Sequence, residues 1–96
     1  MESNLRPRDP RPIRVIAQEI CRIWKNVYFA AKPYLAAMTV IDTIDEKYFN
    51  DSGEEIVLRF LSNAQHFRGA DARRIKKELQ LHLNHQGDIY RDQKEN

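Results

Sequence analysis

Apolar residues near the start of the chain recur at three- and four-residue steps, which is the period of one helix face. The members of this stripe are Ile13, Ile16, Ala17, Ile20 and Trp24. Polar residues fill most of the positions between them, and Pro12 stands where a helix can begin, because the first turn does not need its N–H. The pattern predicts a first helix over residues 12–25.

A second stripe follows the next proline. Pro33 would break a hydrogen bond inside a helix, so it marks a helix start, and apolar residues then recur at helical steps as far as Ile44. We expect a second helix over residues 33–44. The β-branched residues in this segment favour instead a short strand over residues 38–44, and that alternative stays open. The aromatic linker at residues 27–29 is expected to pack under the helices.

The later part of the chain predicts two more helices. Ser52 with Glu55 three residues later matches a capping box ahead of an apolar run, so a third helix is expected over residues 53–65. Gly69 can adopt the positive φ that ends or turns a helix. A fourth helix is then expected from Asp71 to Leu83, followed by a frayed tail without periodicity.

These elements predict an all-α fold, a compact bundle of three to four short helices. The helical domain spans residues 12–84, between a flexible basic arm at residues 1–11 and a polar tail at residues 85–96. The expected core consists of Ile13, Ile16, Ile20, Trp24, Leu35, Met38, Ile41, Ile56, Val57, Phe60, Leu61, Ile75 and Leu79. So small a core gives marginal stability, and a homodimer would bury more apolar surface.

Length and composition narrow the function classes. With 96 residues the chain suits one domain, and its single cysteine, Cys21, excludes an internal disulfide framework. Cys21 lies next to the first apolar stripe and is expected as a buried thiol. The sequence shows neither a secretory signal nor an apolar run long enough for a membrane span, so we expect a cytoplasmic protein.

Few residues could carry catalytic or metal chemistry. His82 and His85 form the only close pair of imidazoles, and two solvated histidines near a helix end explain them better than a four-ligand zinc site. The acidic loop does not match the calcium-binding EF-hand pattern at its first and last positions. No serine or cysteine has a recognisable catalytic partner. We therefore expect no enzyme activity, no metal and no cofactor.

Charge is distributed in blocks, although the formal net charge is only +2. Residues 42–55 carry six acidic side chains against one lysine, and they include two neighbouring aromatic residues. An acidic surface with aromatic anchors suits docking to a basic protein or ribonucleoprotein surface. The candidate protein-binding residues are Asp45, Glu46, Tyr48, Phe49 and Asp51. The alternative is an acidic connector that only caps the third helix.

Basic residues supply the second hypothesis. The third and fourth predicted helices, with Gly69 between them, are compatible with a DNA-binding helix-turn-helix, and the N-terminal arginines could track a phosphate backbone. The candidate nucleic-acid-binding residues are Arg6, Arg8, Arg11, Arg14, Arg68, Arg73, Arg74 and Lys77. The alternative is an amphipathic helix whose basic residues form its solvent-exposed face and bind no nucleic acid.

From about Pro12 to Leu83 the chain resembles a group of small uncharacterised proteins encoded by bacteriophages, plasmids and integrative elements. The matching blocks, in order, are RPIRVIAQEI, WKNVYFAAKPYLAAM, DSGEEIVLRFLSNA and FRGADARRIKKELQLHL. The resemblance covers about three quarters of the chain, implies a mobile genetic element as the setting and transfers no catalytic motif. This setting suggests an inhibitor of host defence, of the anti-CRISPR-like class, that binds a macromolecular complex.

Overall fold

The computed structural model describes the backbone of residues 10–95 and the side chains of residues 10–84. Within this part of the chain the fold is mostly helical, with four α-helices, one 3-10 turn and a two-stranded hairpin. The elements are α1 (Ile13–Ile23), η1 (Phe29–Ala31), α2 (Lys32–Met38), β1 (Lys47–Tyr48), β2 (Asp51–Ser52), α3 (Gly53–Ser62) and α4 (Ala70–Glu95). The predicted helical bundle is confirmed.

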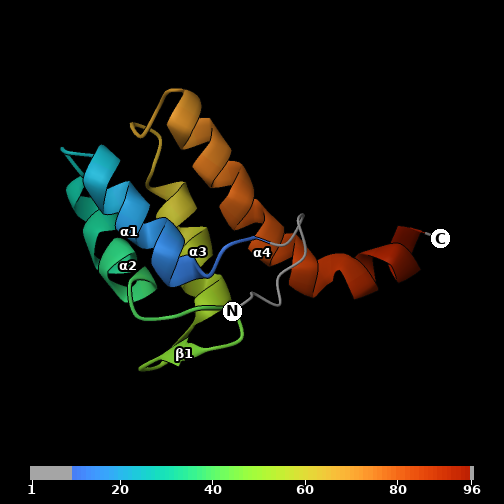
Figure 1. Cartoon of the computed structure of the whole chain (residues 1–96). Helices are drawn as coiled ribbons and strands as arrows, with labels where there is room; N and C mark the ends of the chain where they lie inside the picture. The colour runs from blue at the N-terminus through green and yellow to red at the C-terminus, as the bar shows by residue number, and fades with distance from the viewer. Residues whose placement is uncertain (1–9, 96) are drawn as a thin grey trace, which may run out of the picture.

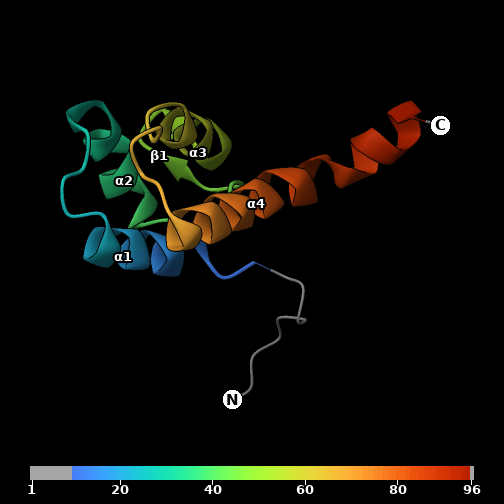
Figure 2. The ribbon, with the colours of Figure 1, turned by 90° about the horizontal axis from the view of Figure 1, so that it is seen from above.

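The four α-helices enclose one core. α2 packs on α1 and α3, and α4 closes the opposite side by packing on the same two helices (Figures 1 and 2). The hairpin lies at one end of the bundle, at the foot of α3, while the last turns of α4 run away from the bundle. The arrangement leaves the hairpin open to solvent beyond the packed helices.

The predicted core is confirmed almost completely. Every predicted core residue is buried except Leu61, which is half-buried and packs against the cluster. Trp24 forms the aromatic centre, because its ring stacks on Phe67 at 5.0 Å between centroids and meets the edge of Phe60 at 6.2 Å. Phe67 was absent from the predicted core because it lies in the connection between α3 and α4, outside any periodic stripe.

α1 lies close to its predicted bounds, and Trp24 closes it by donating its N–H to the Ile20 carbonyl at 2.8 Å. The expectation of a buried thiol at Cys21 was wrong, because this side chain is exposed. Cys21 follows the buried Ile20 by one residue, and one step around a helix is enough to turn a side chain from the core face toward solvent.

α2 ends at Met38, six residues before its predicted end at residue 44, and the alternative strand over residues 38–44 does not form either. The Thr39 hydroxyl donates to the Ala36 carbonyl at 2.6 Å, and the Val40 N–H closes a turn to Ala37 at 3.2 Å. Ile41 and Ile44 are nevertheless buried. Their helical spacing therefore reflects contact with the core from an irregular segment, which the pattern alone does not distinguish from a helix.

The aromatic linker also differs from the expectation. Val27 packs against the core, but the 3-10 turn η1 directs Tyr28 and Phe29 toward solvent, and both are exposed. The prediction that this linker packs under the helices holds only for its first residue.

α3 begins as predicted. The Ser52 hydroxyl accepts the Glu55 N–H at 3.1 Å, which is the expected cap. Gly53 follows directly because a Cβ there would lie 2.7 Å from the Thr43 carbonyl oxygen and 2.8 Å from the Ile44 Cα. The helix start is thus pressed against the preceding loop, and only a glycine allows this approach.

α4 also begins as predicted, with Gly69 at φ 107° in the turn before it. Its helical backbone continues to Glu95, beyond the predicted end at Leu83. The apolar stripe ends at Leu83, which is half-buried and packs against the core. The backbone can continue in helix after the stripe has ended, because residues 84–95 contain no proline.

Candidate functional site

The acidic segment of the sequence folds into the hairpin β1–β2, which the sequence predicted only as a turn region. Lys47 pairs with Ser52 and Tyr48 with Asp51, so Phe49 and Asn50 form a two-residue turn. Phe49 has a φ of 58°, and it is the only non-glycine residue with positive φ in the described part of the chain. A tight hairpin turn requires positive φ in at least one central residue, a position that normally carries glycine, asparagine or aspartate.

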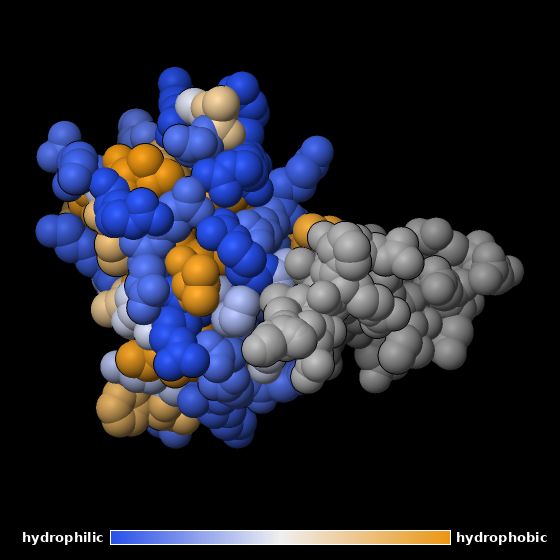
Figure 3. Space-filling model, in the orientation of Figure 1, coloured by the Kyte–Doolittle hydropathy of each residue, from blue (hydrophilic) through white to orange (hydrophobic). Residues whose placement is uncertain are grey.

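The two aromatic rings of this hairpin project together. Phe49 is 84% exposed and Tyr48 is 36% exposed, and their rings meet edge to face with centroids 4.6 Å apart. Figure 3 shows a hydrophobic protrusion at the end of the molecule where Figure 1 draws the hairpin. The Phe49 ring therefore stands in solvent with a neighbouring ring as its support.

The base of the hairpin is held by backbone hydrogen bonds to the start of α3. Gly53 donates its N–H to the Glu46 carbonyl at 2.6 Å, and Glu54 donates to the Ile44 carbonyl at 3.1 Å. The Glu46 carboxylate accepts the N–H groups of Asp42 and Thr43 at 3.1 and 3.2 Å. Glu46 was predicted as a contact residue, but its carboxylate orders the loop, so we treat it as a positioning residue.

The remaining predicted residues are brought together at the hairpin. Asp51 lies opposite Tyr48 in the strand pair, and Asp45 is exposed in the loop that enters β1. Among residues 10–84, no ion pair engages the Asp45 or Asp51 carboxylate. The structure thus presents two uncompensated carboxylates beside two exposed aromatic rings. We call Asp45, Tyr48, Phe49 and Asp51 the hairpin surface.

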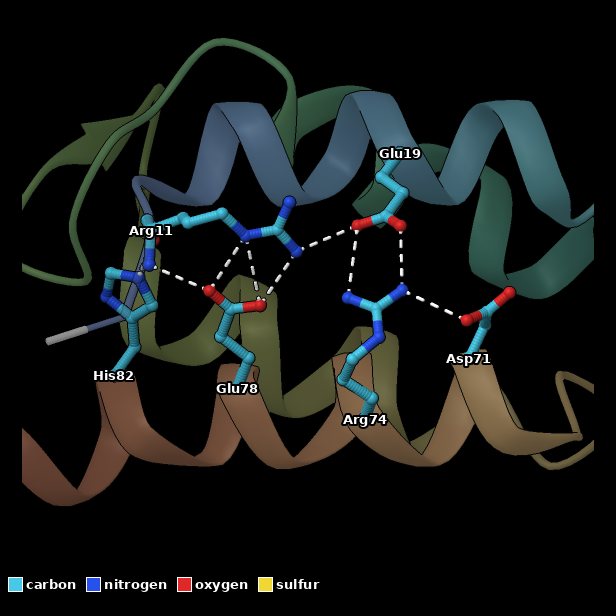
Figure 4. A network of polar contacts seen from close by, with 6 residues as sticks. All are labelled: Arg11, Glu19, Asp71, Arg74, Glu78 and His82. Atoms are coloured by element: carbon cyan, nitrogen blue, oxygen red, sulfur yellow. Dashed lines mark hydrogen bonds and ion pairs between the residues drawn. The ribbon is translucent and has the colours of Figure 1, made fainter. Parts of the chain in front are cut away.

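Two of the basic residues predicted to bind nucleic acid belong to a network of ion pairs between α4 and the N-terminal segment that contains α1. The Arg11 side chain donates to Glu78 at 2.7 Å and to Glu19 at 2.8 Å, and Arg74 donates to Glu19 at 2.8 Å (Figure 4). Arg74 also pairs with Asp71 at 3.2 Å. Arg11 and Arg74, predicted to contact a nucleic acid, are thus already engaged by acidic residues within the fold.

The network also places Arg11 and Pro10 in the fold, although residues 1–11 were expected as a flexible arm. Pro10 is buried, the Arg11 N–H donates to Glu78 at 2.8 Å, and the Arg11 carbonyl accepts from the His82 ring at 2.6 Å. His82 is only 8% exposed, so the expectation of a solvated histidine there was wrong. Arg6 and Arg8 lie outside the described residues, as does the His85 side chain.

The contacts with Arg11 and Arg74 lower the pKa values of Glu19 and Glu78. Hydrogen bonds from Arg74 and then from Arg11 lower the pKa of Glu19 from 4.5 to about 2. Burial raises the pKa of Glu78, but the hydrogen bonds from the Arg11 side chain and backbone outweigh it, so its pKa is lowered. Sequence reasoning missed Glu19, Glu78 and His82, because their meeting depends on how α1 packs against α4 and leaves no local signal.

Among the predicted basic residues within residues 10–84, Arg68, Arg73 and Lys77 remain exposed without an ion pair, while Arg14 pairs with Asp42 at 3.0 Å. The connection between α3 and α4 spans residues 63–69 and buries Phe67. A helix-turn-helix has a turn of about three to four residues, so this longer connection departs from that motif.

Metal binding, membrane insertion and similarity to known proteins were the remaining guides to function. Among them, no three His, Cys, Asp or Glu side chains gather where they could hold a metal ion. No helix in this part of the chain is long and apolar enough to cross a membrane. Comparison with protein-family models, curated proteins and solved structures gave no match for this chain. A relation to proteins of mobile genetic elements therefore stays a prediction from the sequence blocks.

Proposed function

We propose that this protein is a non-enzymatic accessory protein of a mobile genetic element that binds and inhibits a macromolecular complex. The target is a host defence complex in the bacterial cytoplasm, as for anti-CRISPR-like inhibitors, and the hairpin surface makes the contact. The observation that carries the proposal is Phe49, a large apolar side chain that is 84% exposed on a backbone with φ 58°. Such a conformation costs about 1–3 kcal/mol and is typical of functional positions.

The chemistry of the hairpin surface indicates the kind of partner. Asp45 and Asp51 would attract a positively charged surface and speed its encounter with the hairpin. Phe49 and Tyr48 would then enter an apolar pocket, where aromatic anchors supply most of the binding free energy. A protein or ribonucleoprotein that binds nucleic acid through a basic groove offers both features.

The test is affinity purification of the tagged full chain from an infected bacterial host, with the defence activity measured in the same cells. We expect Phe49→Ala to weaken binding of the captured complex by about 2 kcal/mol, roughly 30-fold in Kd, and to restore defence. Asp45→Lys should act in the same direction through charge. Leu81→Ala removes an exposed apolar side chain from α4 and is the matched control. Unchanged binding and inhibition by Phe49→Ala would contradict the proposal.

The alternative function is nucleic-acid binding through α4, and one observation favours it. Arg73 and Lys77 are both exposed and lie one helical turn apart, so they could contact neighbouring phosphates. The double variant Arg73→Glu with Lys77→Glu leaves the ion-pair network intact. Loss of duplex binding at low salt in this variant, with a steep salt dependence for the wild type, would favour the alternative.

A further inference from the structure

The end of the bundle opposite the hairpin differs from it in charge. The end of α1, the turn η1 and the connection between α3 and α4 meet there (Figure 1). They belong to residues 20–41 and 56–70, which contain no aspartate or glutamate. Lys25 and Arg68 are exposed in these segments. Asp71, in the first turn of α4 at this end, is already paired with Arg74, so Lys25 and Arg68 leave the end with a net positive charge.

Exposed aromatic rings meet edge to face at the same end, with interplanar angles of 65° between Tyr28 and Phe29 and 66° between Tyr28 and His66. Phe29 is 73% exposed and Tyr28 is 40% exposed, and their ring centroids are 5.1 Å apart. The Tyr28 ring also lies 6.1 Å from the exposed His66 ring, which comes from the connection after α3. Two segments distant in sequence thus bring three flat rings together. We call Tyr28, Phe29 and His66 the aromatic platform.

Cations lie close to this platform along the chain, because Lys25 stands three residues before Tyr28 and Arg68 two residues after His66. Phe67, the neighbour of His66, lies under the Lys76 ammonium at 5.9 Å from the ring centroid. Burial, and then the nearby charge of Arg68, lower the pKa of Lys76, so two like charges are held close together. The Arg68 Nε donates only to the Gln65 carbonyl, at 3.2 Å. An arriving anion would relieve this repulsion.

We propose that the aromatic platform and its bordering cations bind single-stranded nucleic acid. Unpaired bases stack on Phe29 and Tyr28, and the phosphates follow the positive charge of Arg68 and Lys25. Flat exposed rings next to cations are the usual arrangement for binding single strands without sequence preference. A duplex hides its base faces, and an acidic peptide uses the cations but not the ring faces. Arg68 is also one of the basic residues predicted to bind nucleic acid, but this site differs from the α4 alternative because it depends on stacking.

The test is fluorescence anisotropy of a labelled thymidine oligonucleotide of about 12 nucleotides, within the usual site size of such proteins, at about 50 mM salt. We expect the wild type to bind this strand more tightly than a duplex of equal length. Phe29→Ala should weaken binding at least about tenfold, as alanine substitution of a stacking aromatic does. Phe29→Tyr should keep it, and Arg68→Glu should reduce both affinity and salt dependence.

The hairpin provides matched controls at the other end of the molecule. Phe49→Ala and Lys47→Glu remove an exposed ring and a positive charge there, and they should leave binding of the strand unchanged. Because Phe29 and Tyr28 are exposed, Phe29→Ala should keep the wild-type circular dichroism and melting curve. Tyr28→Ala is the second variant and should show the same loss of binding.

Three outcomes would overturn the proposal. The first is no binding of the strand by the wild type at low salt. The second is equal binding by Phe29→Ala, which would assign any affinity to charge alone. The third is self-association: the molecular mass of the wild type in solution rises with protein concentration, that of Phe29→Ala and of Phe49→Ala does not, and the wild type does not bind the strand. That result would identify the acidic hairpin of a second copy as the occupant of the platform.

Discussion

Phe49 has a backbone conformation that large side chains seldom adopt. Its ring is exposed, and within residues 10–84 its one aromatic contact is with the neighbouring Tyr48 ring, so the fold gains little from it. Gly53 shows the opposite case, because its missing side chain lets α3 approach the loop backbone at residues 43–44. The Phe49 backbone conformation therefore lowers the stability of the fold while it exposes an aromatic ring, whereas Gly53 allows close packing.

We predict that Phe49→Asn stabilises the fold. Asparagine tolerates positive φ better than phenylalanine, and relief of that conformation is worth about 1 kcal/mol. The free energy of unfolding in urea should therefore rise by up to that amount. Phe29→Asn replaces an equally apolar exposed residue outside such a turn and should give no gain. A less stable Phe49→Asn would show that the ring supports the hairpin.

Gly53→Ala should destabilise the protein by about 1–3 kcal/mol, the usual range for overpacking. The new Cβ would meet backbone atoms of Thr43 and Ile44, which cannot move as a side chain can. The midpoint of urea unfolding measures the change. Glu54→Ala, at the next and exposed position, is the control and should shift the midpoint much less. An unchanged midpoint in Gly53→Ala would show that the loop backbone at residues 43–44 moves to accommodate the new Cβ without cost.

At the scale of elements, the contact between α1 and α4 combines apolar packing with the network of Arg11, Glu19, Arg74 and Glu78. Glu19 lies between two guanidinium groups, and Arg11 connects the segment before α1 to both helices. The network therefore ties the start of the described chain to α4, and it uses two arginines that would otherwise be available to an anionic ligand.

The network predicts a dependence of stability on pH. The pKa of Glu19 is about 2 in the folded protein against an ordinary value of 4.5. The stabilisation from its charged form is therefore complete above about pH 4.5 and is lost as the pH falls toward 2. Thermal melting between these values measures the loss. Glu19→Gln should be less stable at neutral pH and should lose less on acidification.

A matched control is available in α3. Glu55→Gln breaks an exposed pair with Arg59, and a pair of this kind contributes about 0.3–0.5 kcal/mol. Its melting temperature at neutral pH should stay close to that of the wild type. If Glu19→Gln behaves in the same way, the network contributes no more than a surface pair.

At the level of the whole molecule, one aromatic cluster joins the end of α1 to α3 and to the connection that follows it. Phe60 on α3 is completely buried against Trp24, the only tryptophan of the chain. The same fold separates the hairpin surface and the aromatic platform at opposite ends (Figure 1). A partner at one end would therefore leave the other end accessible. Homodimerisation remains a prediction, which the mass in solution tests.

We predict that Phe60→Ala leaves the fold barely stable at room temperature. Removing a buried phenylalanine costs about 3–5 kcal/mol, while a small domain has a total stability near 5 kcal/mol, so up to about half of the molecules should be unfolded. Trp24 fluorescence without denaturant should then show a mixture of buried and exposed indole. Phe60→Leu keeps much of the volume and should remain folded with a lower urea midpoint. A cooperative transition of Phe60→Ala at the wild-type midpoint would contradict the prediction.

The parts of the fold that local chemistry controls could be predicted from the sequence. Hydrophobic periodicity predicted the helices and nearly all of the core, because burial of an apolar stripe requires that spacing. Ser52 and Gly69 predicted where α3 and α4 begin, because a cap and a positive φ act within a few residues. The acidic and aromatic residues of the hairpin surface were also recognisable as a cluster.

Tertiary packing settles which charged residues are free to meet a partner. Arg11 and Arg74 read as exposed charges in the sequence, but acidic residues of other segments engage them. The Glu46 carboxylate instead accepts backbone N–H groups of its own loop. The aromatic platform likewise joins residues from two distant segments. Such contacts depend on how helices pack, and packing is a property of the whole chain. The periodicity of one segment therefore shows which face it buries, but not which segment covers that face.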